Sequence, residues 1–269
     1  MIPWFEYGFA SAYRQNGGRI LAQYPDWAGC DRHGGLLTKN GFEWLNALDD
    51  RVQDFMLQLM LEVLTHYPVD GVQGDDRLPV FPVEGGYDRA TQNLYYRETG
   101  REPPKNPRDP DWMKWRSDRL TQFLHRLYDQ VKAVRPGAIV SMAPSPYPFG
   151  YEEYLQDIPT WIRHGLVDWL HPQLYRRTFK DYRRMVDAML RYCTAPDGSP
   201  GILLAPGMLV KSGSYLISGD DLTRGLQYNH QTGLAGEVFF FAEAFFQNQG
   251  SLGTQLRNIR PGQSPKSPF

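Results

Sequence analysis

Short apolar runs alternate with amphipathic segments along nearly the whole chain, and this alternation limits the possible folds most strongly. The amphipathic segments carry apolar residues at helical spacing, as in Val52, Met56, Met60 and Leu64. We predict six strands, at residues 1–9, 69–74, 138–143, 166–171, 202–206 and 236–242. No antiparallel hairpin is predicted. The pattern therefore indicates an α/β fold with a parallel sheet and right-handed crossovers.

The segments between these strands are predicted to be helices or long loops. Helices are expected at 52–66, from Trp112 to the Arg135-Pro136-Gly137 stop, and at 152–164, 179–192 and 222–231. Asp220 and Asp221 place negative charge ahead of the last of these, where a helix N-terminus favours it. Residues 14–46 and 75–110 are predicted as loops, and their length favours a functional role.

Six strands are two short of a closed eight-stranded barrel. The chain also opens inside a predicted strand, so we expect strands three to eight of a TIM-type (β/α)8 barrel lacking its first two strands, over residues 1–246, with a gene product that begins further upstream. Residues 247–269 are expected to form a C-terminal tail that is partly disordered. A doubly wound open sheet is the alternative, but it predicts a Gly-rich phosphate turn that the sequence lacks.

Composition narrows the classes of partner. The 29 basic and 30 acidic residues leave a net charge of −1, which does not favour nucleic acid. Aromatic residues make up 14% of the chain, and such residues line sugar sites as well as protein cores. Cys30 and Cys193 are predicted to be free thiols, and no run is long enough to cross a membrane. The compartment is left open, and it is extracytoplasmic or periplasmic if an upstream signal peptide exists.

Two adjacent carboxylates follow the second predicted strand, in the run Val69-Asp70-Gly71-Val72-Gln73-Gly74-Asp75-Asp76-Arg77-Leu78. In (β/α) barrels the active site lies where strands end and loops begin. Because strand side chains alternate, Asp75 shares a face with Gly71 and Gln73 and is predicted to point inward. Asp76 is predicted to hold the loop or to pair with an arginine. The alternative is that both acids only cap the loop or bind Arg77.

Glu6 and Glu243 are further acidic candidates. Glu6 lies among aromatic residues within a strand, where a charge must be paired or functional. Glu243 ends the last strand after three phenylalanines, and aromatic walls can raise a carboxyl pKa. A solvent-facing position for Glu243 is equally compatible with the sequence.

Candidate substrate-binding residues lie at other strand ends. His171, Gln173 and Tyr175 share one face and could bind sugar hydroxyls or form a buried polar network. Trp4 and Tyr147 are candidate platforms for a sugar ring. Ser145 lacks the setting of a nucleophile elbow, and no metal-ligand spacing involves Asp75, Asp76 or His171. We therefore expect neither a metal nor a cofactor.

Several stretches together resemble a known family. Ile2–Phe9, Val69–Asp76, Ser141–Pro146, Gly165–Tyr175 and Gly236–Phe241 occur in order, and they are similar to glycosyl-hydrolase-like family 10, with distant similarity to the domain that hydrolyses poly-N-acetylglucosamine. The resemblance implies a TIM-type barrel and glycoside hydrolysis. Two positions depart from the family, which commonly has a bulky residue in place of Gly74 and an aromatic one in place of Arg77.

These observations lead to a functional prediction with named alternatives. The first is a glycoside hydrolase acting on a polysaccharide that contains amino sugars, with Asp75 as general acid. Glu6 or Glu243 would stabilise or attack the oxocarbenium-like centre of the sugar. Within it, the sugar N-acetyl group could replace the protein nucleophile, with Asp76 orienting the amide. The alternatives are a non-catalytic carbohydrate-binding or scaffold protein on a degenerate barrel and a metal-dependent hydrolase.

Overall fold

A parallel sheet runs through the computed structural model, which describes residues 1–193, 202–247 and 250–259. Its strands are β1 (Trp4–Phe5), β5 (Gly71–Gly74), β6 (Ile139–Met142), β7 (Trp169–Leu170) and β8 (Leu203–Leu204), in that spatial order. Spatial order therefore equals chain order, as right-handed crossovers between neighbours produce. The prediction of a parallel α/β sheet is confirmed.

The sixth predicted strand continues this order through a second ladder. β9 (Gly207–Leu209) follows β8 after two residues, and β12 (Val238–Phe240) pairs with it in parallel. Within the described ranges, β1 pairs only with β5 and β12 only with β9, so these two strands form the edges. The order never reverses, in contrast to the switch point of a doubly wound sheet.

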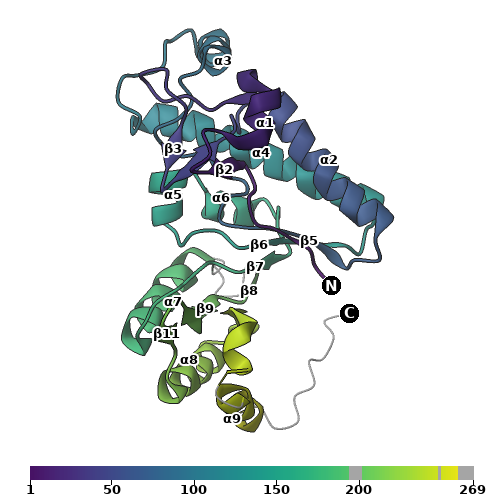
Figure 1. Cartoon of the computed structure of the whole chain (residues 1–269), viewed down its shortest axis with the longest axis vertical. Helices are drawn as coiled ribbons and strands as arrows, with labels where there is room; N and C mark the ends of the chain where they lie inside the picture. The colour runs from purple at the N-terminus through teal and green to yellow at the C-terminus, as the bar shows by residue number, and fades with distance from the viewer. Residues whose placement is uncertain (194–201, 248–249, 260–269) are drawn as a thin grey trace.

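Two long helices cover one face of the sheet. α2 (Asp50–His66) is capped at its N-terminus by Asp49, whose side chain accepts a hydrogen bond from the Arg51 amide. α4 (Pro110–Val134) is capped in the same way by Asp109. The two helices pack side by side (Figure 1). Strand residues directed to the same core are buried; they are Val72, Met142, Leu170 and Leu204. The ladder residues between them, Gln73, Ser141 and Trp169, lie on the opposite face.

The predicted helix at 152–164 is wrong, because two short helices replace it. α5 (Phe149–Tyr154) ends at Leu155, which adopts a left-handed conformation with a φ of 60°. α6 (Ile158–Arg163) then starts anew at Asp157, whose side chain accepts from the Thr160 amide, with Pro159 in its first turn. A proline is tolerated only in that first turn, so its position sets where the second helix begins.

The prediction of no antiparallel hairpin is also wrong. Residues 14–46 contain α1 (Gly18–Gln23), a short 3-10 turn η1 (Pro25–Trp27), β3 (Thr38–Lys39) and β4 (Phe42–Trp44), and β4 pairs antiparallel with both β3 and β2 (Ala10–Tyr13). The turn between β3 and β4 is Asn40-Gly41, with φ values of 54° and 83°. Asn-Gly is the strongest short-range hairpin signal because both positions need positive φ. We refer to β3, β4 and this turn as the β3–β4 hairpin.

The remaining elements complete the loops and the C-terminal part. α3 (Arg89–Thr99) lies within the segment predicted as a loop, and β10 (Lys211–Ser212) and β11 (Tyr215–Leu216) form a second hairpin. α7 (Phe179–Cys193), α8 (Gly219–Gln231), η2 (Ala242–Phe245) and α9 (Ser251–Ile259) lie at the other end of the molecule from α1 and α2 (Figure 1). Part of the predicted tail is thus helical, and residues 260–269 lie outside the described residues.

Candidate functional site

The two adjacent carboxylates lie immediately beyond β5, at the end of the strand where the sequence places them. Asp75 is 2% exposed, whereas the side chain of Asp76 is 30% exposed. Asp75 continues the face of Gln73, which in turn accepts a hydrogen bond from the Ser141 hydroxyl. Asp75 is therefore a buried carboxyl beside the polar side chains at the end of β5.

Gln173 holds one oxygen of Asp75. Its Nε2 donates to Asp75 Oδ1 at 2.7 Å and to the Ala143 carbonyl at 3.1 Å. Gln173 itself is fixed beyond β7 by a parallel bridge to Gly207. The exits of β5, β6 and β7 are thus joined through one amide group, which orients the carboxyl of Asp75.

Arg77 holds the other oxygen of Asp75 and connects it with two further carboxylates. Its Nη2 lies 2.7 Å from Asp75 Oδ2 and 3.7 Å from Glu6 Oε1, and its Nη1 lies 3.1 Å from Asp76 Oδ1. Its Nε donates to the Glu6 carbonyl at 2.9 Å, and the guanidinium stacks 4.6 Å from the Phe42 ring. Arg77 was not predicted as a site residue, although its place two residues after Asp75 was the available signal.

Burial and the neighbouring Asp76 carboxylate raise the pKa of Asp75 to about 8, against the opposing effect of Arg77. Removing a carboxylate from water favours its neutral form, and a second negative charge beside it does the same. The raised pKa favours the protonated form of the Asp75 carboxyl. A buried, protonated carboxyl at a strand end has the protonation state that a general acid needs.

His171 and Tyr175 lie in the segment after β7 that also supplies Gln173. His171 is buried, its Nδ1 donates to the Ala205 carbonyl at 2.9 Å, and burial lowers the pKa of its ring. The neutral imidazole thus keeps Nε2 as an acceptor. The Tyr175 ring stacks on Phe240 at 4.8 Å, and burial with the nearby charges of Asp75 and Asp76 raises the pKa of its hydroxyl.

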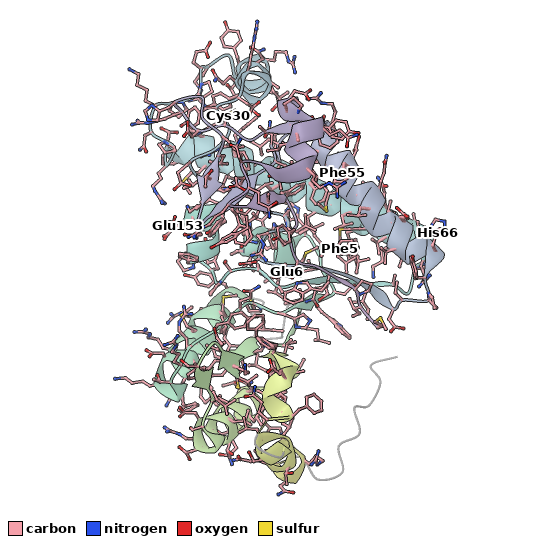
Figure 2. The ribbon with its side chains drawn as sticks, in the orientation of Figure 1. Phe5, Glu6, Cys30, Phe55, His66 and Glu153 are labelled. Atoms are coloured by element: carbon pink, nitrogen blue, oxygen red, sulfur yellow. The ribbon has the colours of Figure 1, made fainter. Side chains whose placement is uncertain are left out.

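The other candidates have different surroundings. Within the described residues, Glu6 is linked to the acid pair through Arg77, and its side chain is 62% exposed. Figure 2 labels Glu6 next to Phe5 in the middle of the molecule. Trp4 pairs with Gln73 in the ladder and is half-exposed. Glu243 contacts Lys211 at 3.5 Å and Gln247 at 2.8 Å, and Tyr147 packs on Tyr192 at 4.6 Å. The structure therefore brings together Asp75, Asp76, Gln173 and Tyr175, with Glu6 at the margin.

A small polar pocket adjoins Asp76. Its volume is about 70 Å³. Its lining comes from the β3–β4 hairpin, the residues after β5 and the end of α5, and it consists of Lys39, Asn40, Phe42, Trp44, Asp76, Arg77 and Tyr154. We call it the hairpin pocket. The hairpin residues were missed as site residues because the Asn40-Gly41 turn was overlooked.

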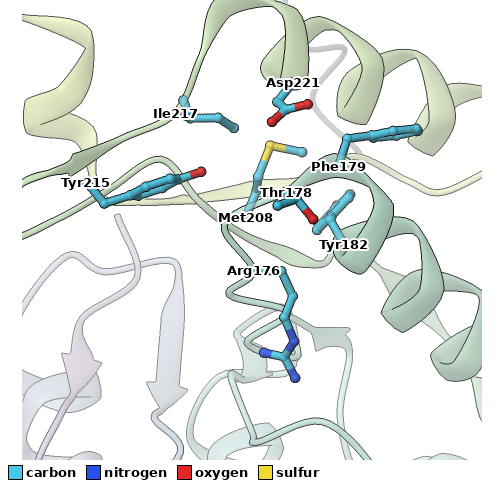
Figure 3. A pocket seen from close by; sticks show the side chains of 8 residues that line it. All are labelled: Arg176, Thr178, Phe179, Tyr182, Met208, Tyr215, Ile217 and Asp221. Atoms are coloured by element: carbon cyan, nitrogen blue, oxygen red, sulfur yellow. The ribbon is translucent and has the colours of Figure 1, made fainter.

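Two further cavities have different linings. A cavity of about 310 Å³ has Glu6 in its lining, and its walls are mostly apolar, with Phe55, Met56 and Leu59 of α2 among them. A third cavity between α7 and α8 measures only about 10 Å³, and Figure 3 shows Arg176 extending away from Tyr215, Met208 and Asp221 at its walls. That volume is no larger than one water needs.

Two further findings concern metals and membranes. Among residues 1–193, 202–247 and 250–259, no three His, Cys, Asp or Glu side chains are grouped closely enough to hold a metal ion. No helix in this described part is both long and apolar enough to cross a bilayer.

Comparisons with known proteins concern mainly the first 193 residues. The family model named glycosyl hydrolase-like 10 matches residues 1–193. The glycosyl hydrolase DigH of Escherichia coli (strain K12) is 28% identical over 157 residues, which cover 49% of this chain and 34% of that protein. The glycosyl hydrolase YngK of Bacillus subtilis (strain 168) is 26% identical over 141 residues, covering 46% and 26%. The matched part thus spans about a third or less of each relative.

Solved structures share the fold at low sequence identity. The PgaB (BpsB) glycoside hydrolase domain from Bordetella bronchiseptica has a TM-score of 0.63 at 13% identity, covering 86% of this chain and 68% of that one. An alpha-L-fucosidase from Paenibacillus thiaminolyticus has a TM-score of 0.57 at 13% identity, covering 82% and 31%. The family match extends over well more than half of the sequence, and it includes the acid pair and Gln173. The chain belongs to the glycosyl hydrolase-like 10 family.

Proposed function

We propose that this protein is a glycoside hydrolase that cleaves a polysaccharide containing amino sugars, with Asp75 as the general acid. The observation that carries the proposal is the state of Asp75, which is buried beyond β5 with a pKa raised to about 8 and is held by Gln173 and Arg77. The relatives' description as glycosyl hydrolases supports the reaction class. The amino-sugar specificity is supported by resemblance alone.

The five parallel strands in chain order, followed by the parallel pair of β9 and β12, support a barrel-type arrangement of residues 1–246. In such an arrangement the strand exits that carry Asp75, Gln173 and Tyr175 face one end of the sheet, and substrates bind at that end in (β/α) barrels. Trp4, Tyr147 and His171 are proposed as further sugar contacts.

The proposed chemistry begins with proton transfer from Asp75 to the glycosidic oxygen as the bond to the anomeric carbon breaks. Positive charge develops on the sugar, and Asp75 becomes a carboxylate. Arg77 and Gln173 then stabilise the new charge through the contacts already present on its two oxygens. Water then attacks the anomeric carbon, its oxygen forms the new C–OH bond, and the proton that it gives up replaces the one that Asp75 donated.

A second group must stabilise or attack the oxocarbenium-like centre of the sugar, and this group is either a carboxylate or part of the substrate. Asp76 and Glu6 share Arg77 with Asp75, whereas Glu243 is bound to Lys211, so we favour the first two. A separation of about 5–5.5 Å between the working carboxyls in a substrate complex would indicate retention, and about 6.5–9.5 Å inversion. If the N-acetyl group acts instead, Asp76 orients it.

A non-catalytic glycan-binding protein is the second candidate. The observation that favours it is the ion pairing of Arg77 with both members of the acid pair, which could hold them in an unreactive state. Glycan binding without any release of reducing ends would support this candidate.

The test measures reducing-end release from a panel of polysaccharides that includes de-N-acetylated poly-N-acetylglucosamine. Loss of a general acid lowers rates by roughly 10²–10⁴-fold, so Asp75→Asn should be nearly inactive while still folded. Asp70→Asn is the matched control, since Asp70 is exposed on the same segment and pairs with the chain's N-terminal amine. Full activity in Asp75→Asn would refute the assignment.

A further inference from the structure

Three aromatic side chains form a cluster beside the acid pair, and two of them are open to solvent. Tyr7 is 48% exposed and Tyr13 is 41% exposed. Both rings contact the ring of Phe42, at centroid distances of 5.9 and 5.0 Å and at interplanar angles of 75° and 63°. Neither tyrosine is therefore stacked face to face on Phe42, and each keeps ring surface accessible. We call these three residues the aromatic platform.

The antiparallel ladder between β2 and β4 places two of these rings on one face. Tyr13 and Phe42 are partners in the ladder, and so are the adjacent residues Ala12 and Glu43. Ala12 and Glu43 are buried, so strand alternation turns Tyr13 and Phe42 to the opposite face. The exposure of Tyr13 thus follows from the register of the ladder.

Tyr7 is held beside the same rings by the segment that follows β1. The Phe9 amide donates to the Arg77 carbonyl at 3.0 Å, and a Cβ atom at Gly8 would collide with that carbonyl. Gly8 also has a φ of 51°, so a glycine is needed for this close approach. Arg77 Nε in turn donates to the Glu6 carbonyl at 2.9 Å. The segment is therefore packed directly against the chain that carries the acid pair.

The platform is continuous with the acid pair through one side chain. The Arg77 guanidinium lies 4.6 Å from the centre of the Phe42 ring. Its Nη2 lies 2.7 Å from Asp75 Oδ2, and its Nη1 lies 3.1 Å from Asp76 Oδ1. A polymer that has one unit at Asp75 can therefore place a neighbouring unit on the platform when it extends past Arg77.

The chemistry of the platform fits a carbohydrate chain. A sugar ring has a face of C–H groups and an edge of hydroxyls, and tyrosine offers a rigid apolar face together with a hydroxyl. Single-stranded nucleic acid also stacks on aromatic rings, but it needs a positively charged groove. Here Arg77 is paired with the acid pair, and the exposed carboxylate of Glu6 follows in the chain directly before Tyr7. This balance of charges does not favour a polyanion.

We propose that Tyr7, Tyr13 and Phe42 form a stacking subsite for a sugar unit of an amino-sugar chain that extends beyond the bond to be cleaved. The subsite rests on the proposed glycosidase function, which puts another unit of the same chain at Asp75. Covering the exposed rings removes apolar surface from water, and an exposed apolar patch with a polar rim is typical of a binding surface. The platform adds affinity and takes no part in proton transfer.

The first test measures binding of the glucosamine and N-acetylglucosamine hexamers by calorimetry to the Asp75→Asn protein, which is expected to leave them uncleaved. At least one hexamer should bind. In the same background, Tyr7→Ala and Tyr13→Ala should each weaken its binding by about threefold to tenfold, the size of one aromatic contact. Tyr7→Phe and Tyr13→Phe keep the ring and should stay within about twofold of the parent protein.

Tyr67→Ala is the matched control for the loss of an exposed tyrosine. Tyr67 is 59% exposed, but it follows α2 and precedes β5, whereas the acid pair follows that strand. Its replacement should leave hexamer binding unchanged. Melting curves establish that each variant is folded, and Tyr7 lies outside β2, so the two alanine variants test the platform independently of each other.

The second test uses enzyme with Asp75 intact and the polysaccharide that it cleaves. Tyr7→Ala and Tyr13→Ala should raise KM with a smaller effect on kcat, because a contact made equally in the bound substrate and the transition state changes binding alone. A lowered kcat with an unchanged KM would overturn the stacking role.

Three binding outcomes would also overturn the platform. Neither hexamer binds, or the folded alanine variants bind as tightly as the parent protein, or they dissociate a dimer in sedimentation while hexamer binding is unchanged. The last outcome would make this surface an interface between two copies of the chain. If the unsubstituted enzyme still releases reducing ends from polysaccharide in any of these cases, the proposed function stands and only the platform fails. If nothing binds and nothing is cleaved, both proposals fail.

Discussion

The side-chain amide of Gln173 donates a 2.7 Å hydrogen bond to Oδ1 of Asp75, although the two residues follow strands that are not neighbours in the sheet. The strand between them, β6, participates through the Ala143 carbonyl, which accepts from the same Nε2. Three strand exits are therefore tied to the orientation of one carboxyl. This relationship makes Gln173 a positioning residue for the proposed acid.

Replacement of Gln173 by leucine should lower kcat with a smaller effect on KM. The substitution keeps the size of the side chain but removes the donor, and misplacing a reacting group by about 1 Å can cost roughly a hundredfold in rate. Steady-state kinetics on the polysaccharide that the enzyme cleaves would measure the change. Gln23→Leu, at an exposed position on α1, is the control and should keep full activity. An unchanged kcat in Gln173→Leu would show that Gln173 does not position the Asp75 carboxyl for catalysis.

Replacement of Arg77 by methionine should move the alkaline limb of kcat/KM to higher pH. The guanidinium lowers the pKa of Asp75, so its loss lets that pKa rise further, by about one unit or more. The rate itself should fall, because the carboxylate formed after proton transfer loses its cation. Arg101→Met is the control, since Arg101 is exposed and pairs with the exposed Asp111. A limb that stays in place or moves to lower pH would contradict the prediction.

Stability should depend on pH through Asp75. Its pKa is raised from 3.8 to about 8, so the folded protein binds this proton more tightly than the unfolded chain does. Its contribution to stability is fully present below about pH 4 and is lost as pH rises toward 8, with a slope of at most about 1.4 kcal/mol per pH unit. The Asp75→Asn variant has no carboxyl to ionise at this position, so it does not lose this stability as pH rises. Urea unfolding at pH 4, 6 and 8 should show the variant gaining stability relative to the unsubstituted protein as pH rises, and a constant difference would contradict the raised pKa.

Substitution of Gly71 by alanine should destabilise the sheet. A Cβ atom at Gly71 would lie 2.2 Å from the backbone oxygen of Ile139 on the paired strand β6, and backbone cannot move aside cheaply. We expect a loss of about 2–3 kcal/mol or more in the free energy of unfolding, as for severe overpacking. Gly137→Ala, where nothing lies within 4 Å of the added atom, should change stability by no more than about 0.5 kcal/mol. Equal urea midpoints for the two variants would refute the packing argument.

Helices and strand order were predictable because local patterns encode them. The apolar spacing in 52–66 predicts α2, which the structure has at Asp50–His66, and the proline stop near Arg135 predicts the end of α4. Strand alternation predicts Asp75 on the face of Gln73, since the side-chain period of a strand does not depend on distant residues, and Asp75 is buried. The broken helix at Leu155 and the β3–β4 hairpin were missed, although Pro159 and Asn40-Gly41 were visible in the sequence.

The sequence by itself determined the alternating elements, their parallel order and an acidic pair at a strand end, because periodicity and chain order act locally. Only the tertiary structure decided which groups surround that pair. Arg77 can neutralise it and stack on Phe42 only once the hairpin folds back over the exit of β5. The raised pKa of Asp75 likewise arises from desolvation and from charges brought together across the fold. Electrostatics and enclosure depend on distances between segments far apart in the chain, and spacing along the sequence does not contain those distances.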